Sequence, residues 1–169
     1  MTVLGVLMAI AMPNMQTFIL SKRLSSDVNG FVGLINCALS KAFARNQDVI
    51  ICPKSKSGIT CEASQFCEEY EVQIFVDVNG NRDRNTTDTL LKTILASDTT
   101  STGRRLTPNS GSGSIKLSAV GLSQTAHRFD VLQVNAPDSA FEPRYGRSIC
   151  ISLPGRPRVA PLRTVCIDF

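Results

Sequence analysis

Residues 2–46 read TVLGVLMAIAMPNMQTFILSKRLSSDVNGFVGLINCALSKAFARN, and their apolar pattern changes from one end to the other. Residues 2–12 are apolar on every side, whereas the part beyond Pro13 has apolar residues at steps of three and four. This stripe comprises Leu24, Val28, Phe31, Ile35, Leu39 and Ala42. The charged side chains fall on the solvated side of the same helix, namely Lys22, Arg23, Lys41 and Arg45. The pattern predicts one long helix to about Asn46, kinked but not ended at Pro13, whose second half packs on a globular head.

The N-terminal segment allows three interpretations. Residues 1–21 carry no charge, but the apolar run is shorter than the roughly 20 residues that a bilayer core requires. A signal peptide would explain its length and the triplet Ala9-Ile-Ala11, but not the missing positive n-region. A core helix of a soluble protein is a second interpretation. A membrane helix whose first part precedes this sequence is the third, and the continuation of the helical pattern beyond Pro13 favours it.

After the helix, strand-like segments alternate with turn signals. The apolar run within Asp48–Cys52 predicts a buried strand, and Asn79-Gly80 predicts a β-hairpin after a strand at Val72–Asp77. Residues 97–114 are rich in Ser, Thr and Gly and predict an exposed loop. Further strands are expected at Leu90–Leu95, Ile115–Val120, Arg128–Val134, Ser148–Leu153 and Thr164–Phe169. One helix and about seven strands in meander order predict an α+β domain, an antiparallel β-sheet head packed on the helix's apolar stripe.

The six cysteines indicate disulfides. No C-x-x-C pair is present and His127 is the only histidine, so a zinc site is not expected. Disulfides imply an oxidising compartment such as a periplasm. The spacing predicts the pairs Cys52–Cys61 and Cys150–Cys166, each closing a short loop. Cys37 lies near the helix's apolar stripe and is expected to be a buried thiol, while Cys67 either pairs with it or stays free.

Two groups of polar residues resemble known sites and have simpler explanations. Oxygen-bearing side chains alternate as in a calcium loop at Asp77, Asn79, Asn81 and Asp83. A calcium loop needs a glutamate at its twelfth position, which is Asp88 here, and a hairpin turn explains the same residues. A hydrolase triad of Ser123, His127 and Asp130 lacks the G-x-S-x-G pattern. We therefore expect no catalytic residue, no cofactor and no bound metal.

The C-terminal end is basic. Residues 144–169 hold five arginines and one acidic residue, Asp168. After the turn Pro154-Gly155, Arg156 and Arg158 project one step apart from a segment that a proline stiffens. Arg147 precedes the adjoining strand, and Arg163 follows. If Cys150 and Cys166 are joined, these arginines are expected to gather on one disulfide-closed loop. Guanidinium groups held close together can bind successive phosphates by paired hydrogen bonds, which predicts DNA binding without sequence preference. A basic loop that keeps the head soluble, or that pairs with an acidic neighbouring subunit, is the alternative.

Several motifs resemble those of a known family. Residues 4–14, LGVLMAIAMPN, resemble the segment of type IV pilins and pseudopilins that follows their processing site. Four further motifs stand in the order of the GspH/FimT branch of that family: KAFARNQDV at 41–49, Cys52-Pro53 followed by Cys61, FVDVNGN at 75–81 and GRPR at 155–158. The family's basic leader and its G-F-T-L-I-E pattern are absent, so the chain is expected to begin late, at an internal methionine.

The resemblance implies an organisation and a function. Residues 1–21 are then a membrane-embedded helix segment, and 22–169 form a head in the periplasm of a bacterium, anchored by a single pass in the inner membrane. Other pilin or pseudopilin subunits are the expected partners through the N-terminal helix. FimT-like minor pilins carry G-R-x-R and bind double-stranded DNA during natural transformation, so the expected DNA-binding residues are Arg147, Gly155, Arg156, Arg158 and Arg163. The alternative is a GspH-like minor pseudopilin, a structural component of a type II secretion system.

Overall fold

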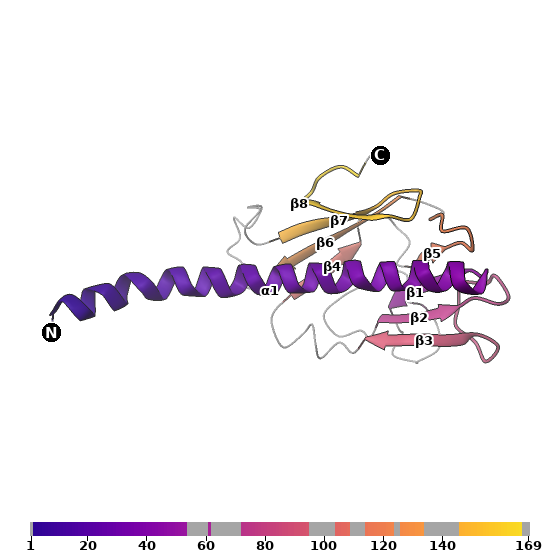
Figure 1. The fold of residues 1–169 in the computed structure, drawn as a ribbon, viewed down its shortest axis with the longest axis horizontal. Helices are drawn as coiled ribbons and strands as arrows, with labels where there is room; N and C mark the ends of the chain where they lie inside the picture. The colour runs from indigo at the N-terminus through magenta and orange to yellow at the C-terminus, as the bar shows by residue number, and fades with distance from the viewer. Residues whose placement is uncertain are drawn as a thin grey trace.

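The computed structural model describes residues 2–53, 61, 72–94, 104–108, 114–123, 126–133 and 146–166. One long helix, α1 (Thr2–Arg45), precedes the strands. In chain order the strands are β1 (Val49–Pro53), β2 (Val72–Val76), β3 (Thr89–Ile94), β4 (Arg104–Pro108), β5 (Ile115–Leu117), β6 (His127–Gln133), β7 (Gly146–Ile151) and β8 (Pro157–Pro161). Figure 1 shows the C-terminal half of α1 lying across the head and the N-terminal half extending beyond it.

The helix packs as its apolar stripe predicts. Every residue of the stripe is buried or half-buried, and the four charged residues expected on the solvated side are exposed. The helix continues through Pro13, so the proline does not end it. In the extending part, Met15 and Phe18 are 66% and 60% exposed. Within the described part of the chain, no helix combines the length and the apolarity that crossing a bilayer requires.

The end of α1 is set by a left-handed residue. Asn46 has φ of 51°, a conformation that asparagine tolerates better than most side chains. The N–H of Asn46 donates to the carbonyl of Phe43, and the N–H of Gln47 donates to the carbonyl of Ala42. These two bonds form a Schellman motif, which satisfies carbonyls at the helix end and turns the chain into β1.

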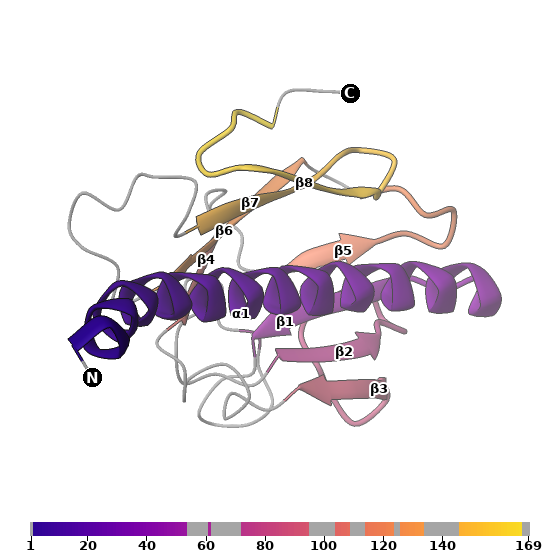
Figure 2. The same ribbon diagram turned by 60° about the vertical axis from the view of Figure 1, so that its left-hand side comes forward.

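The head contains two antiparallel sheets, not the single meander that the sequence predicts. Their strand orders are β3-β2-β1-β5 and β4-β6-β7-β8. The helix contacts strands of both sheets, and Figure 2 shows β1–β3 on one side of α1 with β7 and β8 on the other. The main core lies between them and includes Ile35, Ile51, Leu117, Phe129 and Ile149. A second cluster, Ile50, Cys52 and Phe75, covers the opposite face of β1, which explains the unbroken apolar run of this strand.

Two strand predictions were wrong. Strand β4 lies within the segment 97–114 that its Ser, Thr and Gly content marked as a loop, because pairing with β6 overrides local composition. The last strand is β8, with a proline at each end, and not a strand at Thr164–Phe169. Prolines are tolerated because β8 is an edge strand and lacks a partner on one side. Residues 164–166 are irregular, and 167–169 lie outside the described residues.

Candidate functional site

The β7–β8 hairpin carries the arginines that the sequence singled out. Ile151 lies opposite Pro157, and Cys150 lies opposite Arg158. In the connecting turn, the N–H of Gly155 donates to the carbonyl of Ser152 at 2.8 Å, and the N–H of Ser152 donates to the carbonyl of Arg156 at 3.3 Å. Arg156 and Arg158 are both exposed. The turn therefore holds the backbone of Arg156 while its side chain stays accessible.

Gly155 is required by the packing of this turn. It is buried and has φ of +72°. A Cβ at this position would overlap the carbonyl oxygen of Gly121 and lie 3.0 Å from Cδ2 of Leu39. The N–H of Ser123 also donates to the carbonyl of Leu153 at 2.8 Å. The turn thus rests directly on the 118–123 loop and on α1, which places the next residue, Arg156, at a defined position.

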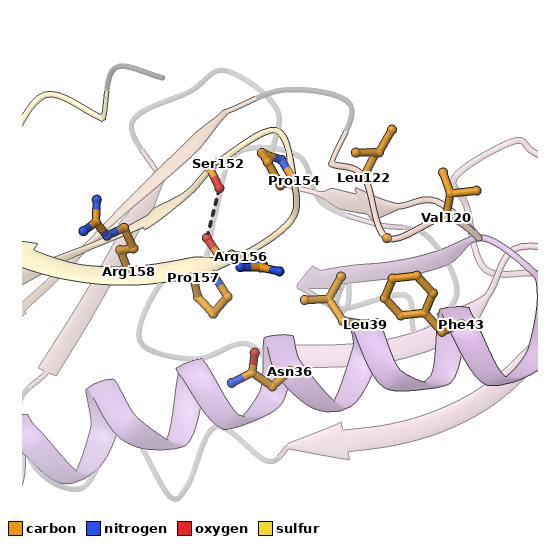
Figure 3. Close-up of a pocket in the computed structure, with 11 residues that line it drawn as sticks. Asn36, Leu39, Phe43, Val120, Leu122, Ser152, Pro154, Arg156, Pro157 and Arg158 are labelled. Carbon is orange, nitrogen blue, oxygen red and sulfur yellow. Dashed lines mark hydrogen bonds between the residues drawn. The ribbon is translucent and has the colours of Figure 1, made fainter. Parts of the chain in front are cut away.

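An open hollow of about 970 Å³ lies beside the turn. One wall comes from the last turns of α1, a second from the 118–123 loop, and a third from the hairpin turn (Figure 3). Its lining residues are Asn36, Leu39, Phe43, Val120, Gly121, Leu122, Ser152, Pro154, Arg156, Pro157 and Arg158. Figure 3 shows the guanidinium of Arg156 directed toward Leu39, with Arg158 at the far end. Among the described residues, the lining contains two cations and no acidic side chain.

The structure does not bring all the predicted arginines together. Arg147 lies opposite Pro161 at the end of the hairpin away from the turn, four residues from the Ile151–Pro157 pair, or about 13 Å along the strand. Its N–H group (Nη1) donates to the carbonyl of Gly146. Arg163 follows β8 at the same end. The hairpin therefore has two basic ends, one with Gly155, Arg156 and Arg158 and the other with Arg147 and Arg163.

A polar network holds the second basic end. Arg163 has φ of +62°, and its backbone N–H donates to Oγ of Ser148 at 2.8 Å. Ser148 in turn donates to Oδ1 of Asp130 at 2.6 Å. Nε of Arg128 lies 3.4 Å from the same carboxylate oxygen, and its Nη1 donates to the carbonyl of Thr164. The buried carboxylate is thus paired and hydrogen-bonded, as a charge in a protein interior must be.

Both expected disulfides are present in the structure. Cys150 and Cys166 are joined with their Cα atoms 5.5 Å apart, and Cys52 and Cys61 with theirs 5.6 Å apart. The first closes a loop that contains the hairpin turn and β8, since Cys150 lies within β7 and Cys166 follows β8; Arg147 lies outside this loop. The prediction for Cys37 was wrong: this free cysteine is exposed, because it lies beside the buried stripe and not in it. Cys67 lies outside the described residues.

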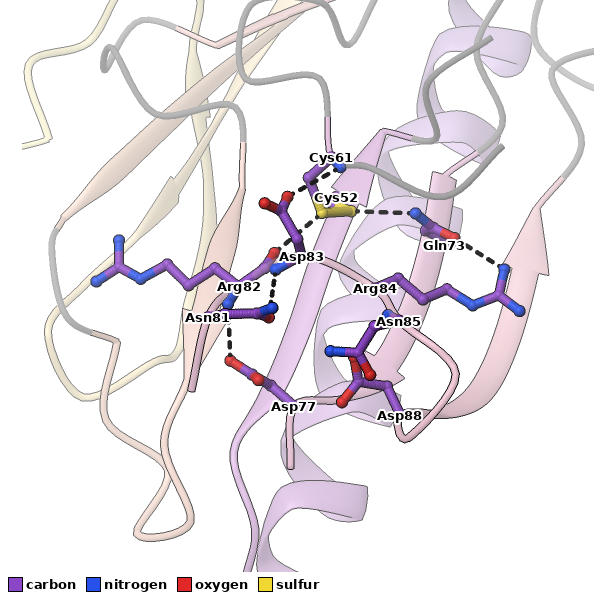
Figure 4. Close-up of a disulfide and its surroundings, with 10 residues drawn as sticks. All are labelled: Cys52, Cys61, Gln73, Asp77, Asn81, Arg82, Asp83, Arg84, Asn85 and Asp88. Atoms are coloured by element: carbon purple, nitrogen blue, oxygen red, sulfur yellow. Dashed lines mark hydrogen bonds between the residues drawn. A yellow bond between two sulfur atoms is a disulfide. The ribbon is translucent and has the colours of Figure 1, made fainter. Parts of the chain in front are cut away.

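The loop with the calcium-like spacing connects β2 and β3 and spans residues 77–88, longer than the tight turn that Asn79-Gly80 predicts. The carboxylate of Asp77 accepts from the N–H groups of Gly80 and Arg82, and that of Asp88 accepts from the N–H groups of Val78 and Asn85. The N–H of Cys61 donates to Asp83, so the disulfide also contacts this loop (Figure 4). Among the described residues no cluster of three or more His, Cys, Asp or Glu is arranged to hold a metal.

The residues considered as a hydrolase triad do not form one: Ser123 ends the 118–123 loop and bridges to Leu117 of β5, whereas His127 and Asp130 lie on β6 of the other sheet. His127 and Asp130 are three apart on β6, so their side chains leave opposite faces of the strand. His127 is 2% exposed and its ring stacks on that of Phe129 at 6.2 Å between centroids. Burial lowers the pKa of His127 below 6.5, so the imidazole is neutral at pH 7.

No sequence pattern pointed to the apolar wall of the hollow. Phe43, Val120 and Leu122 are 59%, 65% and 52% exposed. The available signal was that Phe43 follows the last stripe residue, Ala42, and so falls beside the stripe and not on it. Only the fold brings Phe43 next to the 118–123 loop and to Arg156.

The comparisons with known proteins agree on one fold. The family model of type II transport protein GspH matches residues 27–155. The structure is similar to that of type IV minor pilin FimU of Pseudomonas aeruginosa, with 17% sequence identity and a TM-score of 0.61, over 86% of this chain and 96% of that one. A second crystal form of FimU gives a TM-score of 0.57, also at 17% identity, over 85% and 100% of the two chains. No curated protein matches the chain.

Proposed function

Because this chain belongs to the family of type II transport protein GspH and has a pilin fold, we propose that it is a minor pilin of a type IV pilus that binds DNA. The DNA is double-stranded, is bound without sequence preference, and is taken up during natural transformation. Residues 1–21 anchor the chain in the inner membrane, residues 22–169 form the periplasmic head, and the N-terminal helix contacts other pilin subunits.

One observation carries the DNA-binding proposal. The hairpin turn presents Arg156 and Arg158 to solvent, and the buried Gly155 fixes the turn against α1 and the 118–123 loop. The backbone that carries these side chains is already ordered, and the planar guanidinium group loses comparatively little freedom for each of the paired hydrogen bonds that it forms with a phosphate. Such contacts read no bases, which accounts for the expected lack of sequence preference. Arg147 and Arg163 offer a second contact about 13 Å away along the strands.

A specific observation favours the alternative, a GspH-like minor pseudopilin of a type II secretion system. The family match ends at Gly155, immediately before the two exposed arginines. The matched part is therefore the C-terminal part of α1 and strands β1 to β7, which form the framework of the head and not its basic turn. In that case the basic turn contacts an acidic surface of a neighbouring subunit.

A gel-shift titration with a duplex at two salt concentrations tests the proposal. We expect weak binding by the wild type, with a log–log salt slope of about −2 when the two turn arginines each neutralise one phosphate, since each contributes about −0.9. Binding should be largely lost in Arg156→Gln/Arg158→Gln. The matched control Lys41→Gln/Lys92→Gln removes the same charge from exposed positions on α1 and β3 and should bind as the wild type does. A wild type that gives no shift at low salt refutes DNA binding and leaves only the assignment as a pilin-type subunit.

A further inference from the structure

The hollow beside Arg156 has an apolar wall that phosphate binding alone does not explain. Phe43, Val120 and Leu122 are each more than half exposed and line the same hollow as the two turn arginines. A hollow that combines apolar side chains with a few polar and charged groups is the usual composition of a binding site. The hollow, at about 970 Å³, is at the upper end of the 300–1,000 Å³ typical of small-molecule pockets.

The aromatic ring in this wall is held in place. Gly121 has φ of +78°, and a Cβ on it would overlap the ring of Phe43. The ring therefore packs directly on the backbone of this glycine. The backbone carbonyl of Phe43 accepts a hydrogen bond from Asn46 at the end of α1. A ring fixed along one edge and 59% exposed is a platform on which a flat group can stack without a large loss of side-chain freedom.

The two arginines of the hollow favour an anionic ligand, and its aromatic wall favours one with a flat apolar part. Arg156 and Arg158 are the charged residues of its described lining, and Asn36 and Ser152 add polar groups. Figure 3 shows Arg156 between the hairpin turn and α1, with its guanidinium group directed toward Leu39 and with Phe43 beyond Leu39. A ligand that spans these features needs a phosphate next to an aromatic ring, which is the arrangement within one nucleotide of an unpaired strand.

We propose that the hollow binds an unpaired nucleobase, so that the chain prefers single-stranded DNA to a duplex; this rests on the proposed DNA-binding function. A duplex keeps its bases stacked on one another, so it can engage the arginines but leaves the apolar wall uncovered. An unpaired strand can place a phosphate on Arg156 and a base on Phe43 together. Alternating cationic and aromatic contacts of this kind are how single strands are bound without sequence preference.

Fluorescence anisotropy with the full chain in a neutral detergent tests the inference. The probes are a labelled single strand of mixed sequence, the blunt duplex of the same sequence, and an abasic strand of the same length. One stacked base contributes about a 5- to 150-fold preference for the single strand over the abasic strand. We expect the single strand to bind tighter than the duplex by a factor in this range.

Two phenylalanine variants locate the effect. Phe43→Ala should bring the affinity for the single strand down to that for the abasic strand and leave the duplex affinity unchanged, whereas Phe43→Trp should keep the preference. Phe18→Ala is the matched control, because Phe18 is 60% exposed on the same helix but outside the hollow. Because Phe43 is exposed, its truncation should leave the melting temperature nearly unchanged, and this is measured alongside.

The outcomes separate this inference from the proposed function. Duplex binding that depends on the turn arginines, with no preference for the single strand, overturns the inference and keeps the function. A preference that survives Phe43→Ala also overturns it. If Phe43→Ala instead weakens association with another pilin subunit and leaves every DNA affinity unchanged, the hollow is a protein-docking surface and the inference fails. If no DNA binds to the wild type, both fall together.

Discussion

Alanine substitutions at three glycines with similar positive φ measure how the hairpin turn is positioned. Gly80, Gly121 and Gly155 have φ of 77°, 78° and 72°, so an alanine at each must adopt a left-handed φ at a similar cost. Their surroundings differ. A Cβ on Gly80 meets nothing within 4 Å, one on Gly121 meets the ring of Phe43, and one on Gly155 meets the backbone carbonyl of Gly121. A side chain can move aside, whereas backbone of a packed loop cannot.

These contacts give an order of stability losses. Gly80→Ala should lower the free energy of unfolding by about 1 kcal/mol, the cost of a left-handed alanine. Gly155→Ala adds overpacking of about 1–3 kcal/mol and the loss of the bond from Ser123 to Leu153, about 1 kcal/mol, for a total of about 3–5 kcal/mol. Gly121→Ala should fall between the two. For a chain of this size, the melting temperature then falls by about 2–4 °C for Gly80→Ala and about 6–20 °C for Gly155→Ala.

Thermal and urea unfolding of the three variants, followed by circular dichroism, provides the measurement. The double variant Gly121→Ala/Phe43→Ala is the internal control. Removing the ring should restore the part of the lost stability that comes from its overlap with the new Cβ, but not the part that comes from the left-handed φ. Equal losses for Gly80→Ala and Gly155→Ala would refute the close approach of the turn to the 118–123 loop. A Gly121→Ala loss that Phe43→Ala does not reduce would show that the ring is not the obstacle.

Two further predictions concern the core and the anchor. Because burial lowers the pKa of His127, the imidazole is protonated in the unfolded chain at a higher pH than in the folded chain. The free energy of unfolding is therefore highest above about pH 6.5 and decreases below it, by at most about 1.4 kcal/mol per pH unit. Denaturation between about pH 7.5 and 5.5 should show this slope in the wild type, and its persistence in His127→Gln would contradict the assignment. A chain that starts at Lys22 should remain folded and stay in solution without detergent, because the buried stripe begins at Leu24. Gel filtration and circular dichroism check this, and loss of cooperative unfolding would place residues 1–21 in the core of the head.

The general architecture could be predicted from local patterns because each reflects a contact that repeats along the chain. The stripe from Leu24 to Ala42 repeats with the helical period, so one buried side follows directly from residue spacing. The run from Val49 to Cys52 is apolar at every position, which predicts burial on both faces. Cys52 and Cys61, and likewise Cys150 and Cys166, are close enough in sequence for spacing to predict their pairing.

Predictions failed where a distant segment determines the structure. Residues 104–108 form a strand because β6 offers them an edge, and their own composition does not reveal it. The prolines of β8 weaken a strand prediction, yet they are harmless on an edge. The turn at Asn79-Gly80 became a long loop because the carboxylates of Asp77 and Asp88 bind its backbone N–H groups.

The same distinction between local patterns and distant contacts applies to the candidate site. The sequence alone determined that the C-terminal end is basic and that Arg156 and Arg158 closely follow a turn at Pro154-Gly155, because charge and turn chemistry are local. Only the tertiary structure decided that Arg147 and Arg163 lie at the other end of the hairpin, since strand pairing separates residues that a loop would gather. It also decided that Phe43, Gly121 and Arg156 share one hollow. These residues come from three parts of the chain, and no local pattern records which surfaces meet when a helix and two sheets close around one core.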